Sequence, residues 1–339
     1  MRGVATMRRI PGVVMLATVL LVTGLAEPRP VMAVERNVLH AAPAAGPVTL
    51  LSYNVEGLPW PLTHGRGAAA ASIAAELRAM HDRGDGPQVV AVQEAFGDAQ
   101  KAIGTNAGYR YVAYGPSADE AGAPATTPAE RAFVARASLW HGETEGARED
   151  SGLAIFSDYP ILWAKRVAYP RFACAGYDCL ANKGMLAVAL RVPGRAAPLV
   201  VVDTHLNARA ASGVGNDRSL FAYQRQADAL RAFIGAVGGG GASVVLAGDF
   251  NVGNDPARQA YLAQALVAGD GLTIAASETA CGASCRAIAP TPTLAHAKTV
   301  VAYRGTIAAE GQTRSFGTLA DGDRLSDHIG VMRSFGLGA

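Results

Sequence analysis

Polar side chains of the kinds that bind a metal ion or transfer a proton stand at the ends of five apolar runs. They are Asn54 after LLSY, Glu94 after VVAVQ, His205 after VVVDT, Asp249 and Asn251 in VVLAGDFN, and Asp327 and His328 before IGVM. Carboxylate and amide oxygens suit a hard cation such as Mg2+, and imidazoles suit proton transfer. Any single Asn or Asp could be a turn former. Five runs that stop in this way instead predict one site of metal-assisted hydrolysis, where the strand ends converge.

The apolar runs that carry these residues alternate with helical patterns along most of the chain. VTLLSYNV and PQVVAVQEAF are typical of buried strands, and GRGAAAASIAAELRAMHDRG between them has the apolar spacing of a helix. SLFAYQRQADALRAFIGAV is a second amphipathic helix, and the strand SVVLAGDFNVG follows it. Because no linker interrupts this pattern, we predict one α+β domain over residues 48–339. The Pro-rich, charged segment 115–150 is expected to be an excursion near the site or a flexible insertion.

The beginning of the chain predicts export. Three arginines precede an apolar run from Val13 to Ala26, and a VMA cleavage pattern follows. An uncleaved membrane anchor is the alternative, but this run is shorter than the roughly 20 residues that a spanning helix needs. We therefore predict a signal peptide over residues 1–33, a linker over 34–47, and a secreted or periplasmic protein.

Cleavage at this point would leave a nearly neutral protein. Residues 1–33 contain four arginines and one glutamate, so the net charge of +2 becomes −1 for the rest of the chain. Non-specific binding to nucleic acid relies on clustered Lys and Arg. The charge therefore disfavours a nucleic-acid substrate.

The four cysteines form two close pairs, Cys174 with Cys179 and Cys281 with Cys285. An oxidising compartment after export permits disulfides. A zinc site is the alternative, but neither pair has the two-residue spacing of common zinc motifs. We predict two local disulfides.

Six motifs follow one another in an order that resembles the endonuclease/exonuclease/phosphatase superfamily of metal-dependent phosphoesterases. They extend from Val48 to Phe335 and are SYNVEGL, VVAVQEAF, SGLAIFSDYPI, DTHLNA, AGDFNVG and SDHIGV. The resemblance implies a DNase I-like, four-layer α/β/β/α sandwich in which helices flank two packed mixed β-sheets. It also implies a divalent cation, usually Mg2+, with Glu94 as its principal ligand and Asn54 beside it.

The resemblance also implies roles for the other residues at the strand ends. Asp249 would position and activate the attacking water, and Asn251 would hold that water or the phosphate. His205 and His328 would flank the phosphorus, one stabilising negative charge and the other serving as general base or hydrogen-bond donor. Asp327 would support the metal site or orient a histidine.

One expected feature of the superfamily is missing. An aspartate in an Asp-Tyr pair shortly before the last motif usually holds the final histidine, but no aspartate lies between positions 293 and 306. We expect Asp321, Asp323 or Asp327 to orient His328 instead. Without such an acid, His328 would be held less rigidly and turnover would suffer.

Within the superfamily, the middle of the chain is most similar to bacterial neutral sphingomyelinases and related secreted phospholipid phosphodiesterases. The similarity rests on CAGYDCLANKG and on THLNARAASGVGNDRSLFAYQRQ. It implies that Lys183 and Asn207 contact the substrate, with Lys183 near its phosphate. The alternative for Lys183 is a solvated turn. The preferred substrate is then a phospholipid such as sphingomyelin, reached by a monomeric protein through peripheral membrane contact.

The aromatic residues give this lipid assignment little support. Segment 305–324 contains a single aromatic residue, Phe316, and we expect Trp60 and Trp140 to pack in the core. Two other functions therefore stay open. A secreted nuclease would need basic or stacking residues along a groove. A catalytically weakened binding protein on the same scaffold is suggested by the missing aspartate.

Overall fold

The computed structural model describes the whole chain except residues 1–39, 59–62, 240, 281–285, 320–321 and 339. Its first sheet is built from six strands, which are β1 (Val48–Asn54), β2 (Val89–Gln93), β3 (Tyr111–Tyr114), β4 (Ala154–Ser157), β12 (Ile307–Phe316) and β13 (Gly330–Leu337). Their order is β12-β13-β1-β2-β4-β3. Only the β1–β2 pair among them is parallel.

The second sheet has seven strands, which are β5 (Ile161–Ala168), β6 (Gly184–Leu190), β7 (Leu199–His205), β8 (Ser243–Asp249), β9 (Thr273–Ala280), β10 (Arg286–Ile288) and β11 (Ala297–Arg304). Their order is β10-β9-β11-β8-β7-β6-β5. The β7–β8 pair is parallel, and the other described pairs are antiparallel. Both sheets are therefore mixed, as predicted.

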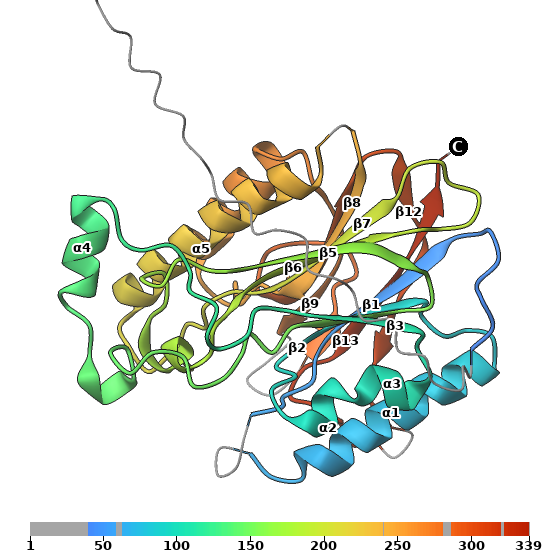
Figure 1. Ribbon diagram of the computed structural model, residues 1–339, viewed down its shortest axis with the longest axis horizontal. Coiled ribbons are helices and arrows are strands. Elements are labelled where there is room, and N and C mark those ends of the chain that lie inside the picture. The colour runs from blue at the N-terminus through green and yellow to red at the C-terminus, as the bar shows by residue number, and fades with distance from the viewer. Residues whose placement is uncertain (1–39, 59–62, 240, 281–285, 320–321, 339) are drawn as a thin grey trace, which may run out of the picture.

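Helices cover the outer faces of the two sheets. The described helices are α1 (Arg66–Asp82), α2 (Asp98–Lys101), α3 (Ile103–Ala107), α4 (Pro128–Val134), α5 (Asn216–Val237) and α6 (Pro256–Leu262), with the short 3-10 helices η1 (Leu139–His141) and η2 (Gly176–Leu180) and the π-helix η3 (Ala263–Ala268). Figure 1 shows α1, α2 and α3 below one sheet and α5 above the other. This arrangement confirms the predicted α/β/β/α sandwich. No helix in the described part of the chain is long and apolar enough to cross a bilayer.

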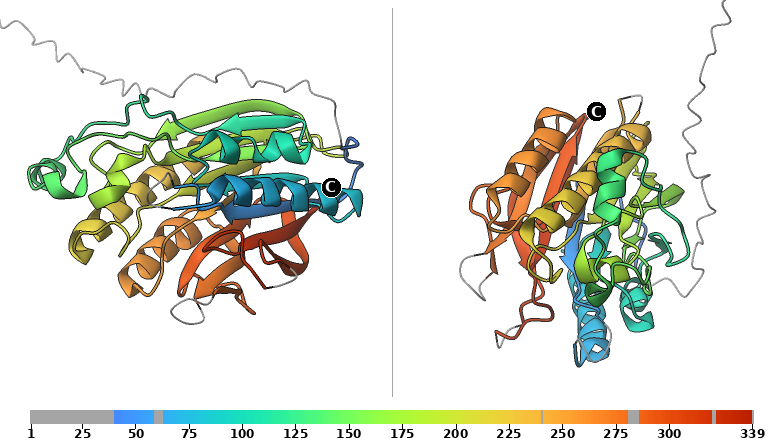
Figure 2. Two further views of the ribbon diagram at one scale, coloured as in Figure 1. Left: turned by 90° about the horizontal axis from the view of Figure 1, so that it is seen from below. Right: turned by 90° about the vertical axis from the view of Figure 1, so that its left-hand side faces the viewer.

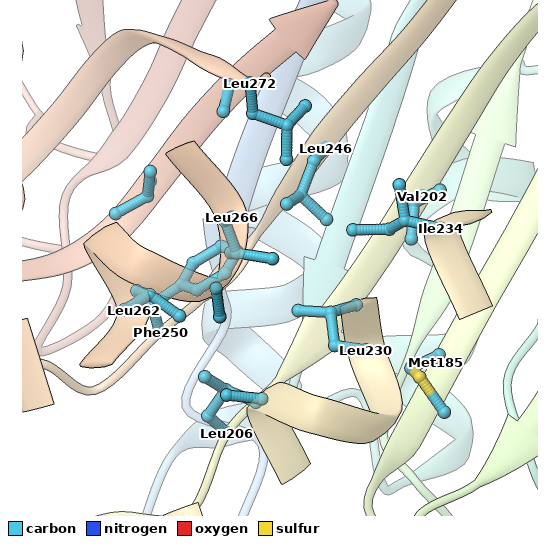
Figure 3. Packing of buried hydrophobic residues seen from close by; sticks show 14 of the residues in the cluster. Met185, Val202, Leu206, Leu230, Ile234, Leu246, Phe250, Leu262, Leu266 and Leu272 are labelled. Atoms are coloured by element: carbon cyan, nitrogen blue, oxygen red, sulfur yellow. The ribbon is translucent and has the colours of Figure 1, made fainter. Parts of the chain in front are cut away.

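The central strands are unbroken apolar runs because both of their faces are covered. Every residue of β7 and of β8 is buried. Figure 3 shows one side of this packing, where Leu230 and Ile234 of α5 lie over Val202 and Leu246 of the sheet. The other faces of these strands meet the first sheet. Strands with two buried faces lose the alternation of polar and apolar residues.

A polar contact joins the two sheets within this apolar interior. Gln93, the last residue of β2, donates through Nε2 to Oδ1 of Asp203 on β7 over 2.7 Å. Both residues are fully buried. Burial raises the pKa of Asp203 well above its usual range, which favours the protonated form of this carboxyl group.

A second polar cluster lies at the far end of β2, where Asp158 follows β4. One Asp158 oxygen is 3.0 Å from Nδ1 of His40, and the other is 3.0 Å from Nε2 of His81. The two imidazole rings are stacked, with centroids 3.6 Å apart and planes 9° apart. Each carboxylate oxygen of Asp158 already pairs with one imidazole. We therefore interpret the cluster as structural, because it connects His40 and α1 to the residue that follows β4.

One predicted disulfide is confirmed. Cys174 and Cys179 are bonded to each other at η2, which is consistent with an oxidising, extracellular environment. The predicted pair Cys281 and Cys285 lies outside the described residues, as do the predicted signal peptide and Trp60.

Candidate active site

The residues predicted from the strand ends come together at one end of the sandwich. The β1–β2 pairing places Asn54 opposite Gln93, directly before Glu94, and the β7–β8 pairing places His205 opposite Asp249. Parallel strands finish at the same edge, so each sheet brings its chemical groups to this end. The two halves touch, because Nδ2 of Asn54 is 3.1 Å from Oδ2 of Asp249.

The centre of the site consists of two carboxylates joined by an amide. Asn54 donates through Nδ2 to Oε1 of Glu94 over 2.8 Å and to Oδ2 of Asp249. Burial raises the pKa of Glu94. Burial also acts to raise the pKa of Asp249, but nearby positive charge, that of His328 first, outweighs burial and holds that pKa well below its usual range. Asp249 is therefore the carboxylate that stays ionised most firmly.

Two residues of the site have strained backbones. Glu94 has φ 59° and Asn251 has φ 46°, both in the left-handed region that non-glycine residues rarely adopt. Glu94 directly follows the last residue of β2, and Asn251 comes two residues after the last residue of β8. The turn at each of these points aims the side chain across the strand ends. Strain of this kind is characteristic of functional sites.

The oxygen atoms at the centre fit a hard divalent cation. Two carboxylates, the buried Asp249 and the partly exposed Glu94, face a single amide nitrogen, and Mg2+ prefers carboxylate oxygens. Oδ1 of Asn54 instead accepts a hydrogen bond from the backbone N–H of Glu56 over 2.9 Å. The Glu94 carboxylate is therefore the group best suited to hold the cation, while the Asn54 amide orients the carboxylates in this arrangement.

His205 is a neutral imidazole surrounded by donors. Its Nε2 lies 3.2 Å from Nζ of Lys183 and 3.2 Å from Nδ2 of Asn251. Burial and the Lys183 charge lower the pKa of His205 to about 3. Since both neighbours can only donate, Nε2 accepts and the proton resides on Nδ1, which has no hydrogen-bond partner among the described residues.

His328 has the opposite character. Its Nε2 lies 3.5 Å from Oδ2 of Asp249, and its Nδ1 lies 3.1 Å from Oε2 of Glu278 on β9. Burial acts to lower the pKa of His328, but Asp249 and Glu278 raise it to about 9. His328 is therefore a cation near neutral pH, in contrast to His205.

The acid that holds His328 differs from the three that we predicted. Glu278 is fully buried and makes the contact, while Asp327 is 4.0 Å from Nε2 of His328 and its side chain is 61% exposed. Asp323 lies on the loop before β13, and Asp321 lies outside the described residues. The expectation that Asp327 orients this histidine is wrong, because β9 pairs with β11 and brings Glu278 from an earlier strand.

Glu278 is itself held by several donors. Its Oε2 accepts from Oγ1 of Thr299 over 2.8 Å, and its Oε1 accepts from the backbone N–H of Ile329 over 3.3 Å. Arg286 Nε lies 3.6 Å from Oε1. The sequence offered one signal, since Glu278 is the only acid in the strand TIAASETA and would face inward beside small residues.

Lys183 belongs to the site, so the alternative of a solvated turn is wrong. It is 7% exposed, and its Nζ pairs with Oδ1 of Asp178 over 2.6 Å in addition to its contact with His205. Sequence analysis did not identify a second cation, Lys298, which donates to Oδ1 of Asn251 over 2.8 Å. Both lysines bring positive charge to the rim of the carboxylate centre.

Asn207 does not join this group. Its Oδ1 accepts from the backbone N–H of Ala175 over 2.9 Å, and its Nδ2 donates to the carbonyl of Ala208 over 2.7 Å. The side chain is fully buried and braces the disulfide loop. We therefore find no atom of Asn207 free to contact a substrate in this arrangement.

Comparison with known proteins agrees with this geometry. The sequence pattern described as the Endonuclease/Exonuclease/phosphatase family matches residues 51–325. A search of curated proteins finds no match. Among solved structures, sphingomyelinase C from Streptomyces griseocarneus is 24% identical and has a TM-score of 0.57, with 85% of this chain and 99% of that chain covered.

Two further solved structures have the same fold at lower identity. Beta toxin from Staphylococcus aureus, in a double-mutant form with bound magnesium ions, is 16% identical with a TM-score of 0.56, covering 86% of this chain and 100% of that chain. D. rerio TDP2, complexed with a single-strand DNA product, is 14% identical with a TM-score of 0.52, covering 85% and 98%. With its matching sequence pattern, its two mixed sheets and its converging strand ends, the chain belongs to the endonuclease/exonuclease/phosphatase family of phosphoesterases.

Proposed function

We propose that this protein is a secreted phosphodiesterase that depends on a divalent cation, preferably Mg2+, and cleaves a phospholipid such as sphingomyelin. The observation that carries the proposal is the contrast between the two imidazoles that flank Asp249. His205 has its pKa lowered to about 3 and His328 has its pKa raised to about 9. Such a pair supplies an uncharged and a charged group on the two sides of one ionised carboxylate.

The residues then divide the chemistry in the following way. Asp249, which stays ionised, accepts a hydrogen bond from the attacking water and orients it. The His328 imidazolium donates a hydrogen bond to a phosphate oxygen, so that it stabilises charge as the phosphorus becomes five-coordinate. A cation held at Glu94 would polarise the phosphate and neutralise part of that charge.

Lys183 and Asn251 complete the proposed phosphate site. Lys183 adds a fixed positive charge beside His205, and the Asn251 amide lies within hydrogen-bonding distance of the same imidazole. A cavity of about 320 Å³ opens on the other side of Lys183, lined in part by Arg171 and Asn182. The lining also includes Asp119, Glu120 and Glu143, so its charge is mixed, and its size suits a small polar headgroup. The likeness in fold to a sphingomyelinase supports the choice of a lipid but does not by itself establish the substrate.

The two other predicted functions have weaker support. A nuclease has one argument, the shared fold with a protein that binds a DNA product. The nearly neutral charge after residue 33 still argues against it. The weakened binding protein was suggested by the missing aspartate, and Glu278 supplies an acid in its place.

The proposal can be tested with the purified protein lacking residues 1–33. Turnover of sphingomyelin, phosphatidylcholine, plasmid DNA and single-stranded DNA would be measured in parallel with Mg2+ and with a chelator. We expect lipid turnover that the chelator and His328→Ala both abolish. His296→Ala is the matched control, because that histidine is exposed. Cleavage of DNA alone would identify a nuclease, and absence of turnover by a folded protein would favour a binding protein.

A further inference from the structure

A group of large apolar side chains is exposed at the end of segment 115–150. Eight large hydrophobic residues of the described chain are exposed, and four of them belong to this region, namely Val134, Leu139, Trp140 and Tyr177. Trp140 is 89% exposed and Leu139 is 72% exposed. The expected core packing of Trp140 is therefore wrong. Tryptophan normally buries most of its surface, so such exposure beside a second large apolar residue indicates an interaction site.

The segment that presents these side chains is firmly attached. Arg218, at the start of α5, donates through Nε to Oε1 of Glu143 over 2.6 Å and through Nη1 to the carbonyl of Phe133 over 3.1 Å. The Phe133 ring stacks on Phe221, with centroids 4.6 Å apart. Figure 1 shows α4 projecting beyond the sandwich beside α5, and the right-hand view of Figure 2 faces it. The exposed residues thus stand on an ordered projection.

This projection adjoins the candidate active site. The carboxylate of Glu143 also accepts from the backbone N–H of Gly176 over 2.7 Å, which ties the projection to η2. Tyr177 of η2 contacts the ring of His141, and the next residue, Asp178, pairs with Lys183. A surface bound by Trp140 would therefore lie beside Lys183, which borders the carboxylates of the candidate active site.

The charges around the exposed group suit a phospholipid surface. Two acids of the projection are engaged, Glu143 with Arg218 and Glu130 with the backbone N–H groups of Thr126 and Thr127. Arg136, between α4 and η1, is exposed and forms no ion pair with a described residue. A Trp and a Leu next to an unpaired Arg match the boundary between acyl chains and phosphate headgroups.

We propose that Val134, Arg136, Leu139, Trp140 and Tyr177 form a docking surface for a phospholipid bilayer, which we name the α4 docking surface. The proposal rests on the proposed lipid substrate, because it explains how a water-soluble protein would bring its site to a headgroup. The segment 305–324 offers no such aromatic residue in its described part. Its Phe316 is 5% exposed and packs against Tyr53.

The test compares vesicle binding with soluble activity. The double change Leu139→Ser and Trp140→Ser would be made in the protein without residues 1–33, and Leu162→Ser would be the control. Leu162 is also exposed, at 40%, but it lies at the end of β5 remote from Lys183. Binding would be measured by flotation with vesicles of sphingomyelin and phosphatidylcholine, and turnover both on these vesicles and on soluble bis(p-nitrophenyl) phosphate.

We expect the double variant to bind vesicles at least tenfold more weakly and to lose vesicle turnover to the same extent. Its activity on the soluble phosphodiester should equal that of the parent protein. Arg136→Glu reverses a charge of the α4 docking surface and leaves its apolar side chains in place. This variant should bind vesicles that contain phosphatidylserine several-fold more weakly than the parent protein does. Thermal unfolding of each variant checks that the projection remains folded.

Three outcomes would overturn the inference. The parent protein could fail to bind vesicles, the double variant could bind as tightly as the Leu162→Ser control, or the double change could split an oligomer in analytical ultracentrifugation. Vesicle binding that depends on Trp140 without any lipid turnover has a different meaning. In that case the docking surface stands and the proposed substrate fails.

Discussion

Replacing Glu278 by Gln tests how far the buried acid determines the state of His328. Glu278 and Asp249 together move the pKa of His328 from 6.5 to about 9, against the effect of burial. That difference corresponds to about 3 kcal/mol in favour of the imidazolium. Asp249 is the largest single source of the rise, and Glu278 contributes through both its hydrogen bond and its charge. We therefore expect the loss of the Glu278 charge to change the protonation equilibrium by about tenfold, or about 1 kcal/mol.

The substituted glutamine keeps the volume of the side chain but loses both its charge and its hydrogen-bonding symmetry. One oxygen can still accept from His328 and Thr299, whereas the new amide group would face the N–H of Ile329. We expect kcat to fall by about ten- to a hundredfold, the range typical when a residue behind a catalytic group is lost. We also expect the alkaline limit of activity to move to lower pH, because His328 loses its proton more easily.

The measurement is kcat against pH on soluble bis(p-nitrophenyl) phosphate, with thermal unfolding of the same samples. Glu310→Gln is the matched control, because it removes one negative charge from an exposed position of β12. A folded Glu278→Gln protein with kcat within twofold of the parent protein, and with an unchanged alkaline limit, would refute the reasoning. An equal loss in Glu310→Gln would refute it as well.

Three further changes probe the scaffold. Lys183→Met leaves the carboxylate of Asp178 without its ion-pair partner. The free energy of unfolding, measured by urea denaturation, should fall by about 3–5 kcal/mol, and adding Asp178→Asn should recover part of this loss. Additive losses from the two changes would contradict the ion pair. Burial acts to lower the pKa of His81, but its hydrogen bond to Asp158 raises that pKa. The protonated imidazole therefore stabilises the folded protein. This stabilisation is complete below the usual pKa of 6.5 and is lost as pH rises through the pKa of the folded state. The free energy of unfolding should therefore fall as pH rises above about 6.5. An equal slope in His81→Asn would contradict this. Leu246→Ala should cost about 2–5 kcal/mol in the same assay, whereas Val267→Ala at the surface should cost less than about 0.5 kcal/mol.

Sequence patterns predicted the fold because its strands are strongly apolar and end at distinctive residues. The runs around Asn54, Glu94, His205 and Asp249 are buried strands in the structure, and their ends meet as expected. Two buried faces give a continuous apolar run that local pattern analysis detects well. The order of the motifs then supported the superfamily resemblance, which implied the four-layer sandwich.

The features that escaped sequence analysis depend on contacts between distant segments. Glu278 reaches His328 through a strand pairing with register shifts, which no local pattern predicts. Lys183 stands between Asn and Gly, as in a solvated turn, but the neighbouring disulfide loop and Asp178 enclose it. Trp140 was assigned to the core on its type alone, and its exposure follows from how Arg218 holds the projection.

The hydrogen bond between Gln93 and Asp203 has a consequence for how the catalytic machinery stays aligned. Asn54 and Glu94 come from one sheet and His205 and Asp249 from the other, so the distances among them depend on how one sheet sits along its partner. Apolar faces alone resist such sliding weakly, since hydrophobic contact is non-directional. A buried polar bond immediately beneath the strand ends fixes the position of one sheet on the other. The alignment of the two sheets therefore also sets the alignment of the candidate active site. If the sheets shifted relative to each other, the protein would lose activity before it unfolded.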